Sequence, residues 1–169
     1  MADDIEVQDF LSQLSLAGLI PADPADALKG GITSVKVEEK QENGRYLENS
    51  VFRTDREMRI SLKWQLTGSL LGSKFFDFPG NWFAQAFLEG WGEQAADHDL
   101  PAEKHKVDKG DQPSPWSYSS FIHVPPDTIK PGAYRLAVTL TYKDEDGEPG
   151  PMAGFIEVPG MIQVYTPNK

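Results

Sequence analysis

The stretch "IKPGAYRLAVTLTYKDEDGEPGP", residues 129–151, decides the fold. From Tyr134 to Tyr142 every second residue is large and apolar, and the residues between them are arginine, alanine and threonine. A period of two puts alternate side chains on opposite faces of an extended chain, so the pattern predicts a β-strand with one buried face. A Pro-Gly pair before this run predicts a turn, and an Asp-Gly pair after it predicts a hairpin.

The same period of two occurs in the sequence before and after this strand. It is clear in residues 33–39, 58–68 (with Ile60, Leu62, Trp64 and Leu66 on one face), 116–126 and 154–165. Residues 81–92 are apolar on both faces and fit a strand or a short helix, and the flanking glycines favour a strand. Pro159-Gly160 predicts a bulge or bend that permits an edge position. Six or seven strands without helical crossovers predict a mainly β, antiparallel sandwich or barrel.

The passage "VPPDTIKPGAYRLAVTLTY", residues 124–142, resembles the entry to the penultimate strand of immunoglobulin-like and fibronectin-like β-sandwiches. Trp64 is similar to the core tryptophan of such domains, although the cysteine pair of antibody domains is absent. The resemblance covers residues 56–166 and implies the fold alone, because this fold carries many unrelated functions. We expect Tyr134 to pack with Trp64 and Leu136, and its hydroxyl to bond a backbone group.

The beginning of the chain differs from the rest. "VQDFLSQLSLAGLI" places Phe10 and Leu14 on one side of a short helix, and prolines and glycines follow it. We therefore divide the chain into an N-terminal helical arm or linker, residues 1–31, and a β-sandwich domain, residues 32–169. The arm would pack on its own domain, dock on a neighbouring subunit, or stay disordered.

The charge balance excludes some partners. The 169 residues include 16 basic and 26 acidic side chains, a net charge of −10, which argues against nucleic acid and anionic membranes. The acidic start "MADDIEVQDF" does not resemble a signal peptide, and no apolar run has the length of a membrane span. We expect a soluble protein in the cytoplasm, or in a particle assembled there. The absence of cysteine excludes disulfides and thiolate zinc sites.

Motifs for catalysis are weak. Asp144, Asp146 and Glu148 alternate around a glycine and could ligate calcium, but Asp-Gly is itself a turn dipeptide, and we expect a solvated hairpin. His98 and His105 lie in a charged interval, residues 93–115, and the spacing between these two histidines matches no metal motif. Without a nucleophile elbow or a phosphate loop, we expect no enzyme, no metal and no cofactor; a metal-dependent hydrolase stays an alternative.

Aromatic residues exceed what one core strand requires. They would cap the ends of the sandwich, contact another subunit, or form a platform for a sugar. Our hypothesis is a non-catalytic interaction or structural assembly module that joins a protein complex, self-association included, through the arm and the aromatic loop. A module that binds carbohydrate or a small ligand is the alternative. The expected partner-binding residues are Phe10, Leu14, Phe75, Phe76, Phe78, Trp82, Trp91 and Trp116.

Overall fold

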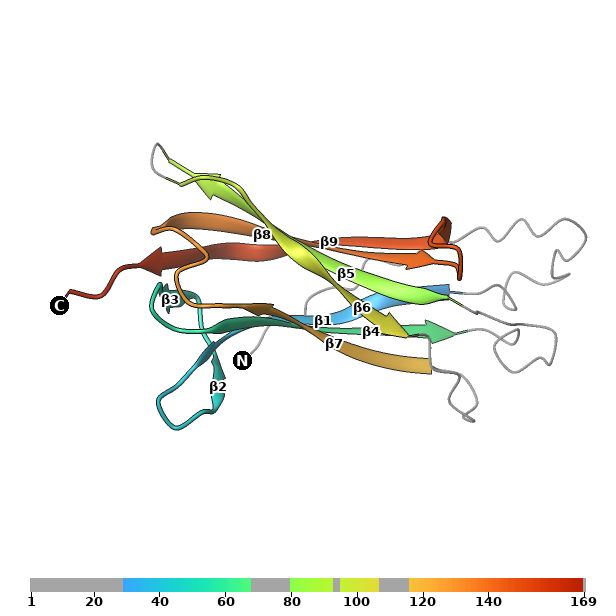
Figure 1. Cartoon of the computed structure of the whole chain (residues 1–169), viewed down its shortest axis with the longest axis horizontal. Coiled ribbons are helices and arrows are strands. Elements are labelled where there is room, and N and C mark those ends of the chain that lie inside the picture. The colour runs from blue at the N-terminus through green and yellow to red at the C-terminus, as the bar shows by residue number, and fades with distance from the viewer. Residues whose placement is uncertain (1–28, 68–79, 93–94, 107–115, 169) are drawn as a thin grey trace, which may run out of the picture.

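The computed structural model describes residues 29–67, 80–92, 95–106 and 116–168, which form nine β-strands and no helix. The strands build two sheets that lie face to face (Figure 1). The four-stranded sheet has the order β2 (Tyr46–Glu48), β1 (Lys29–Lys40), β4 (Met58–Thr67), β7 (Trp116–Val124). The five-stranded sheet has the order β3 (Val51–Arg53), β9 (Pro149–Tyr165), β8 (Gly132–Lys143), β5 (Asn81–Trp91), β6 (His98–Lys106).

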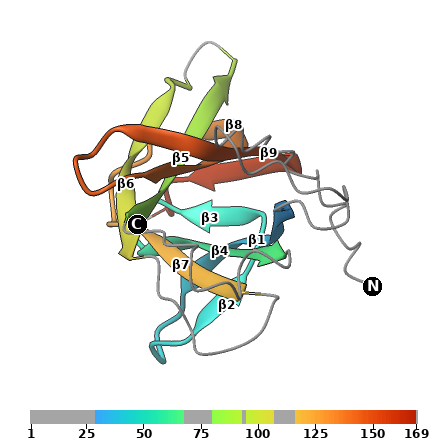
Figure 2. The same ribbon diagram turned by 90° about the vertical axis from the view of Figure 1, so that its right-hand side faces the viewer.

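Neighbouring strands are antiparallel, except that β3 runs parallel to β9. The chain crosses between the sheets several times, for example from β4 to β5 and from β7 to β8, so that each sheet contains strands distant in sequence. Figure 2 shows the two layers from the end, with β3 near the level between them. The mainly β prediction is confirmed, and the chain is sandwich-like.

The core lies between the sheets and follows the predicted alternation. On β4 and β8 every second side chain is buried, and β7 alternates strictly between buried and exposed. At one end, Trp64 stacks on Tyr118 with ring centroids 5.4 Å apart, and Trp82 lies edge-on to Trp64 at 6.1 Å and to Tyr142 at 5.7 Å. Residues 81–91 form a strand, as the glycines indicated.

Tyr134 lies at the other end of the core and is completely buried. Its hydroxyl donates to the carbonyl oxygen of Lys130 at 2.7 Å, which confirms the predicted backbone partner. Its ring contacts His98, with centroids 5.7 Å apart. The prediction that Tyr134 packs with Trp64 was wrong, because Trp64 lies beside Trp82, which pairs with the far end of β8.

Three strands were not predicted: β2, β3 and β6. β6 lies inside the charged interval 93–115, which we read as a connection. It is an edge strand paired only with β5, and Leu100 is its one fully buried side chain among those that the structure describes. An edge strand tolerates charge and can form with few apolar residues, so the period of β6 is faint. β3 is three residues long and buries only Phe52.

The predicted bulge in β9 is present. Gly160 has a φ of 89°, and the pairing with β8 shifts between Tyr134 and Leu136, opposite residues 158–162. Before the bulge, β9 has β8 on one side and no other strand of the described chain on the other. After it, β9 also pairs with β3. The bulge therefore separates the part of β9 that has an open edge from the part whose edge is covered by β3.

Several predictions concern residues outside the described part. The helical arm with Phe10 and Leu14, and the aromatic residues 75–78, lie there. β1 begins at Lys29, three residues before the domain boundary that we expected. Within the described residues, the structure has no helix of the length and apolarity that a membrane span requires.

Candidate interaction surface

The outward side of the five-stranded sheet is the strongest candidate for a functional surface, and we call it the five-stranded face. Because Tyr134, Leu136 and Val138 point into the core, their neighbours on β8 point outward, and pairing extends this parity across the sheet. One row, for example, joins Trp91 on β5 through Ala133 and Gln163 to Val51 on β3.

Large apolar side chains concentrate on this face. Among the described residues seven such side chains are exposed, and five of the seven belong to the five-stranded face. Their exposed fractions lie between 42% and 54%: Val51, Trp91, Phe155, Met161 and Tyr165. Scattered apolar residues are normal on protein surfaces, whereas a gathering on one face is typical of a surface that contacts another molecule.

The small residues in the middle of the five-stranded face and its aromatic residues lie on different strands. The outward residues Ala137 and Thr139 of the middle strand β8 are small, whereas the exposed Arg135 lies between Ala133 and Ala137. Aromatic residues stand on the strands beside it, among them Trp91 on β5 and Phe155 on β9. The result is a low stretch at Ala137 and Thr139, with aromatic side chains on the strands on both sides.

Charges on the face are balanced and partly paired. The guanidinium of Arg135 lies over the ring of Trp91, 4.4 Å from its centroid, and 3.8 Å from the carboxylate of Glu157. Outward charges whose side chains are described on β5, β6, β8 and β9 comprise three cations (Lys104, Arg135, Lys143) and three anions (Glu89, Asp99, Glu157). Arg53 on β3 shares the outward parity and is paired with Asp55, so the charges of the face nearly balance, although the whole chain carries −10.

The expected partner-binding tryptophans take different positions. Trp91 is exposed on the five-stranded face, but Trp82 and Trp116 are 3% and 7% exposed and belong to the core. Their rings therefore present almost no surface to a partner. Phe155 and Met161 were missed, although residues 154–165 carry apolar side chains at both parities of the strand, which was an available signal.

The outward side of the four-stranded sheet carries a charged network instead. The hydroxyl of Tyr46 donates to Glu57, and Lys40 Nζ lies 2.9 Å from the same carboxylate. Arg59 bonds Glu38 at 2.7 Å and stacks 3.9 Å from the centroid of the Tyr46 ring. These groups satisfy one another across three strands, so the network stabilises the sheet and offers no open charge to a ligand.

This network makes stability depend on pH. The hydrogen bond from Tyr46, together with Lys40, lowers the pKa of Glu57 from 4.5 to about 2. A carboxyl whose pKa is lower in the folded state stabilises the fold above its unfolded pKa, and this stabilisation is lost as the pH falls through the folded pKa. We expect the melting temperature to fall as the pH decreases from 4.5 toward about 2.

Melting curves of the wild type and of Glu57→Gln over this pH range test the assignment. Glu57→Gln should melt lower than the wild type at pH 7, and the difference between the two should shrink as the pH falls. An equal difference at every pH would contradict the role of the Glu57 carboxylate.

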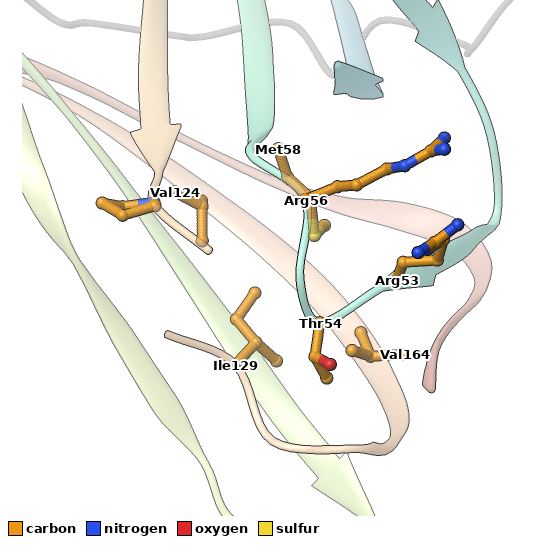
Figure 3. A pocket seen from close by; sticks show the side chains of 8 residues that line it. Arg53, Thr54, Arg56, Met58, Val124, Ile129 and Val164 are labelled. Carbon is orange, nitrogen blue, oxygen red and sulfur yellow. The ribbon is translucent and has the colours of Figure 1, made fainter. Parts of the chain in front are cut away.

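A small indentation lies where the β3–β4 and β7–β8 connections meet (Figure 3). Its apolar floor includes Ile129 and Val164, and two arginines extend from its rim, away from that floor. Arg53 donates twice to Asp55, at 2.9 and 2.7 Å, and Arg56 lies 3.1 Å from Glu39. Since both cations already have anionic partners, the indentation is a poor anion site.

The acidic turn is a hairpin, as expected. Oδ1 of Asp144 accepts from the backbone N–H of Asp146 at 3.0 Å and of Glu148 at 2.9 Å, and Gly147 has a φ of 84°. No group of three side chains that could hold a metal ion occurs in the described part of the chain. His98 points inward and accepts from the backbone N–H of Lys130 at 3.5 Å, while His123 is exposed.

Asp144 thus has a local structural role that can be measured. We expect Asp144→Ala to destabilise the domain by about 1 kcal/mol, because two backbone donors lose their acceptor. Asp144→Asn keeps an acceptor oxygen and should stay within about 0.5 kcal/mol of the wild type. Urea denaturation with calcium and with chelator checks both; a calcium-dependent increase in stability that Asp144→Asn abolishes would contradict the structural role.

No protein-family model matches this sequence, and a search of the curated proteins finds no match.

Proposed function

We propose that this chain is a non-catalytic interaction or assembly module with an immunoglobulin-like sandwich. The connection before β8 supports the fold assignment, since the bond from the Tyr134 hydroxyl to Lys130 resembles the tyrosine corner of immunoglobulin domains. The sheet order supports it too. With β4, β5, β7, β8 and β9 as strands B, C, E, F and G, β4 and β7 share one sheet and β9-β8-β5 form the other.

The five-stranded face is the contact surface in this proposal. The observation that carries it is the gathering of five exposed large apolar side chains on one sheet. Burying such a face against a protein partner would remove these side chains from water, which is the main driving force of association. The segment before β1, for which the sequence predicts a short helix with Phe10 and Leu14 on one side, would supply a second contact to the same complex.

The proposal requires a protein partner rather than a sugar. A carbohydrate platform needs exposed rings, and of the three candidate tryptophans only Trp91 has one, with Arg135 stacked over it. Titration of the intrinsic tryptophan fluorescence with a panel of glycans separates the alternatives. We expect an unchanged spectrum; a saturable change that Trp91→Phe abolishes would favour the carbohydrate-binding alternative.

Paired variants test the contact surface directly. Trp91→Ser/Phe155→Ser removes two exposed rings from the five-stranded face, and Leu47→Ser is the matched control, because Leu47 is 56% exposed on β2 of the other sheet and Phe155 is 54% exposed. Self-association of the pure chain and capture of proteins from the native cell extract are measured together. The double variant should lose associations that the control keeps; equal behaviour of both variants would remove the proposal.

A further inference from the structure

We propose that the partner of the five-stranded face is a second copy of this chain, related by a two-fold axis that passes near Ala137. The inference rests on the proposed function, since it names the partner of the same surface. Ala137 lies in the middle of that surface, on the central strand β8, between Phe87 on β5 and Glu157 on β9.

Charge favours a second copy. Two chains of net charge −10 repel each other, and they can approach closely only through surfaces that are themselves neutral. The five-stranded face comes close to this condition: its described outward side chains comprise four cations, one of which, Arg53, is paired with Asp55, and three anions. A strongly basic partner would instead be attracted to the acidic remainder of the molecule.

The arrangement of these charges is also self-complementary. Glu89 pairs in register with Arg135, and Arg135 lies 3.8 Å from Glu157. The charges at the middle of the face thus run anion, cation, anion across β5, β8 and β9. In an isologous contact the same patch meets itself, so a patch with both signs can match anion to cation without any second surface.

The shape and the area of the five-stranded face agree with a second copy as its partner. The small residues Ala137 and Thr139 on β8 can receive aromatic side chains from the facing copy. Five strands about 4.8 Å apart, with 3, 17, 12, 11 and 9 residues at about 3.3 Å each, give a face of roughly 800 Å². A stable interface buries about 800 Å² on each partner, so this face alone nearly supplies what a dimer needs.

The absence of cysteine makes a specific cross-linking test possible. Face-to-face sheets pack about 10 Å apart, beyond the reach of a disulfide, so a short bismaleimide joins the thiols. Only a residue near a two-fold axis meets its own counterpart. Ala137→Cys of the full chain should therefore become covalently dimeric at low micromolar concentration, while the exposed control Leu47→Cys should stay monomeric.

Adding Phe155→Asp to Ala137→Cys should weaken self-association by about 30-fold and remove the cross-link. Equal cross-linking of the Ala137 and Leu47 variants, or none at any concentration at which both stay folded, overturns the second copy as partner. If the pure wild-type chain is monomeric, it can still capture a different protein from the extract. If Trp91→Ser/Phe155→Ser then loses that protein, only the inference of a second copy fails. If that capture is also unchanged, the proposed function fails with it.

Discussion

Tyr134→Ala is expected to lower the free energy of unfolding by about 3–5 kcal/mol, the usual cost of deleting a large buried aromatic side chain. Tyr134 has no exposed surface, and its hydroxyl fastens the β7–β8 connection to the start of β8 through Lys130. The variant leaves a cavity beside His98 and frees this connection, so both packing and hydrogen bonding are lost. Urea denaturation at neutral pH measures the difference.

Tyr134→Phe separates the two contributions. It keeps the ring and removes only the hydroxyl, which leaves the carbonyl of Lys130 without this donor, and we expect a loss of about 1 kcal/mol. If Tyr134→Ala costs less than Tyr134→Phe is expected to cost, β8 does not enter the core at this position and the assignment of the strand is wrong.

Arg56→Leu is expected to have the second largest effect, a loss of about 3 kcal/mol. Glu39 points into the structure with a side chain that is 4% exposed, and Arg56, itself 20% exposed, lies 3.1 Å from its carboxylate. Removing the guanidinium leaves a buried anion without its cation. Desolvation of an unpaired charge is far more costly than the loss of a surface ion pair.

Two further variants test whether this loss of stability comes from the burial of the Glu39 carboxylate. Arg56→Leu/Glu39→Leu should recover most of the loss, because the uncompensated charge is gone as well. Arg53→Leu should cost less than about 1 kcal/mol, since its partner Asp55 is 45% exposed and the pair is well solvated. Equal losses for Arg53→Leu and Arg56→Leu in thermal denaturation would contradict the importance of the buried Glu39 carboxylate.

The sequence predicted the long strands with one buried face well for a physical reason. β4 and β8 lie between two strands, and β7 is an edge strand that pairs along its whole length with β4. Each of the three holds one face against the other sheet, so alternate positions must be apolar along most of their length. The edge strands β2, β3 and β6 lack this requirement. Tyr46–Glu48 and Val51–Arg53 are too short to display a period, and β6 is mostly polar.

The candidate surface was harder to predict from the sequence, because β5 is apolar on both faces. Trp82 shares its parity with Ala84 and Leu88, whereas Trp91 shares the opposite parity with Phe87. Nothing in this strand alone says which parity faces the core. The neighbouring strand β8 decides it, because its pairing places Trp82 beside the inward Tyr142 and Trp91 beside the outward Ala133.

Sedimentation velocity of the full chain over a wide concentration range tests the central claim most directly. The weight-average mass should rise with concentration from 18.8 kDa toward twice that value for the wild type and for Leu47→Asp, and stay near 18.8 kDa for Phe155→Asp. A wild type that stays at 18.8 kDa throughout, or a Phe155→Asp variant that associates as the wild type does, would contradict the five-stranded face as the surface through which two copies meet.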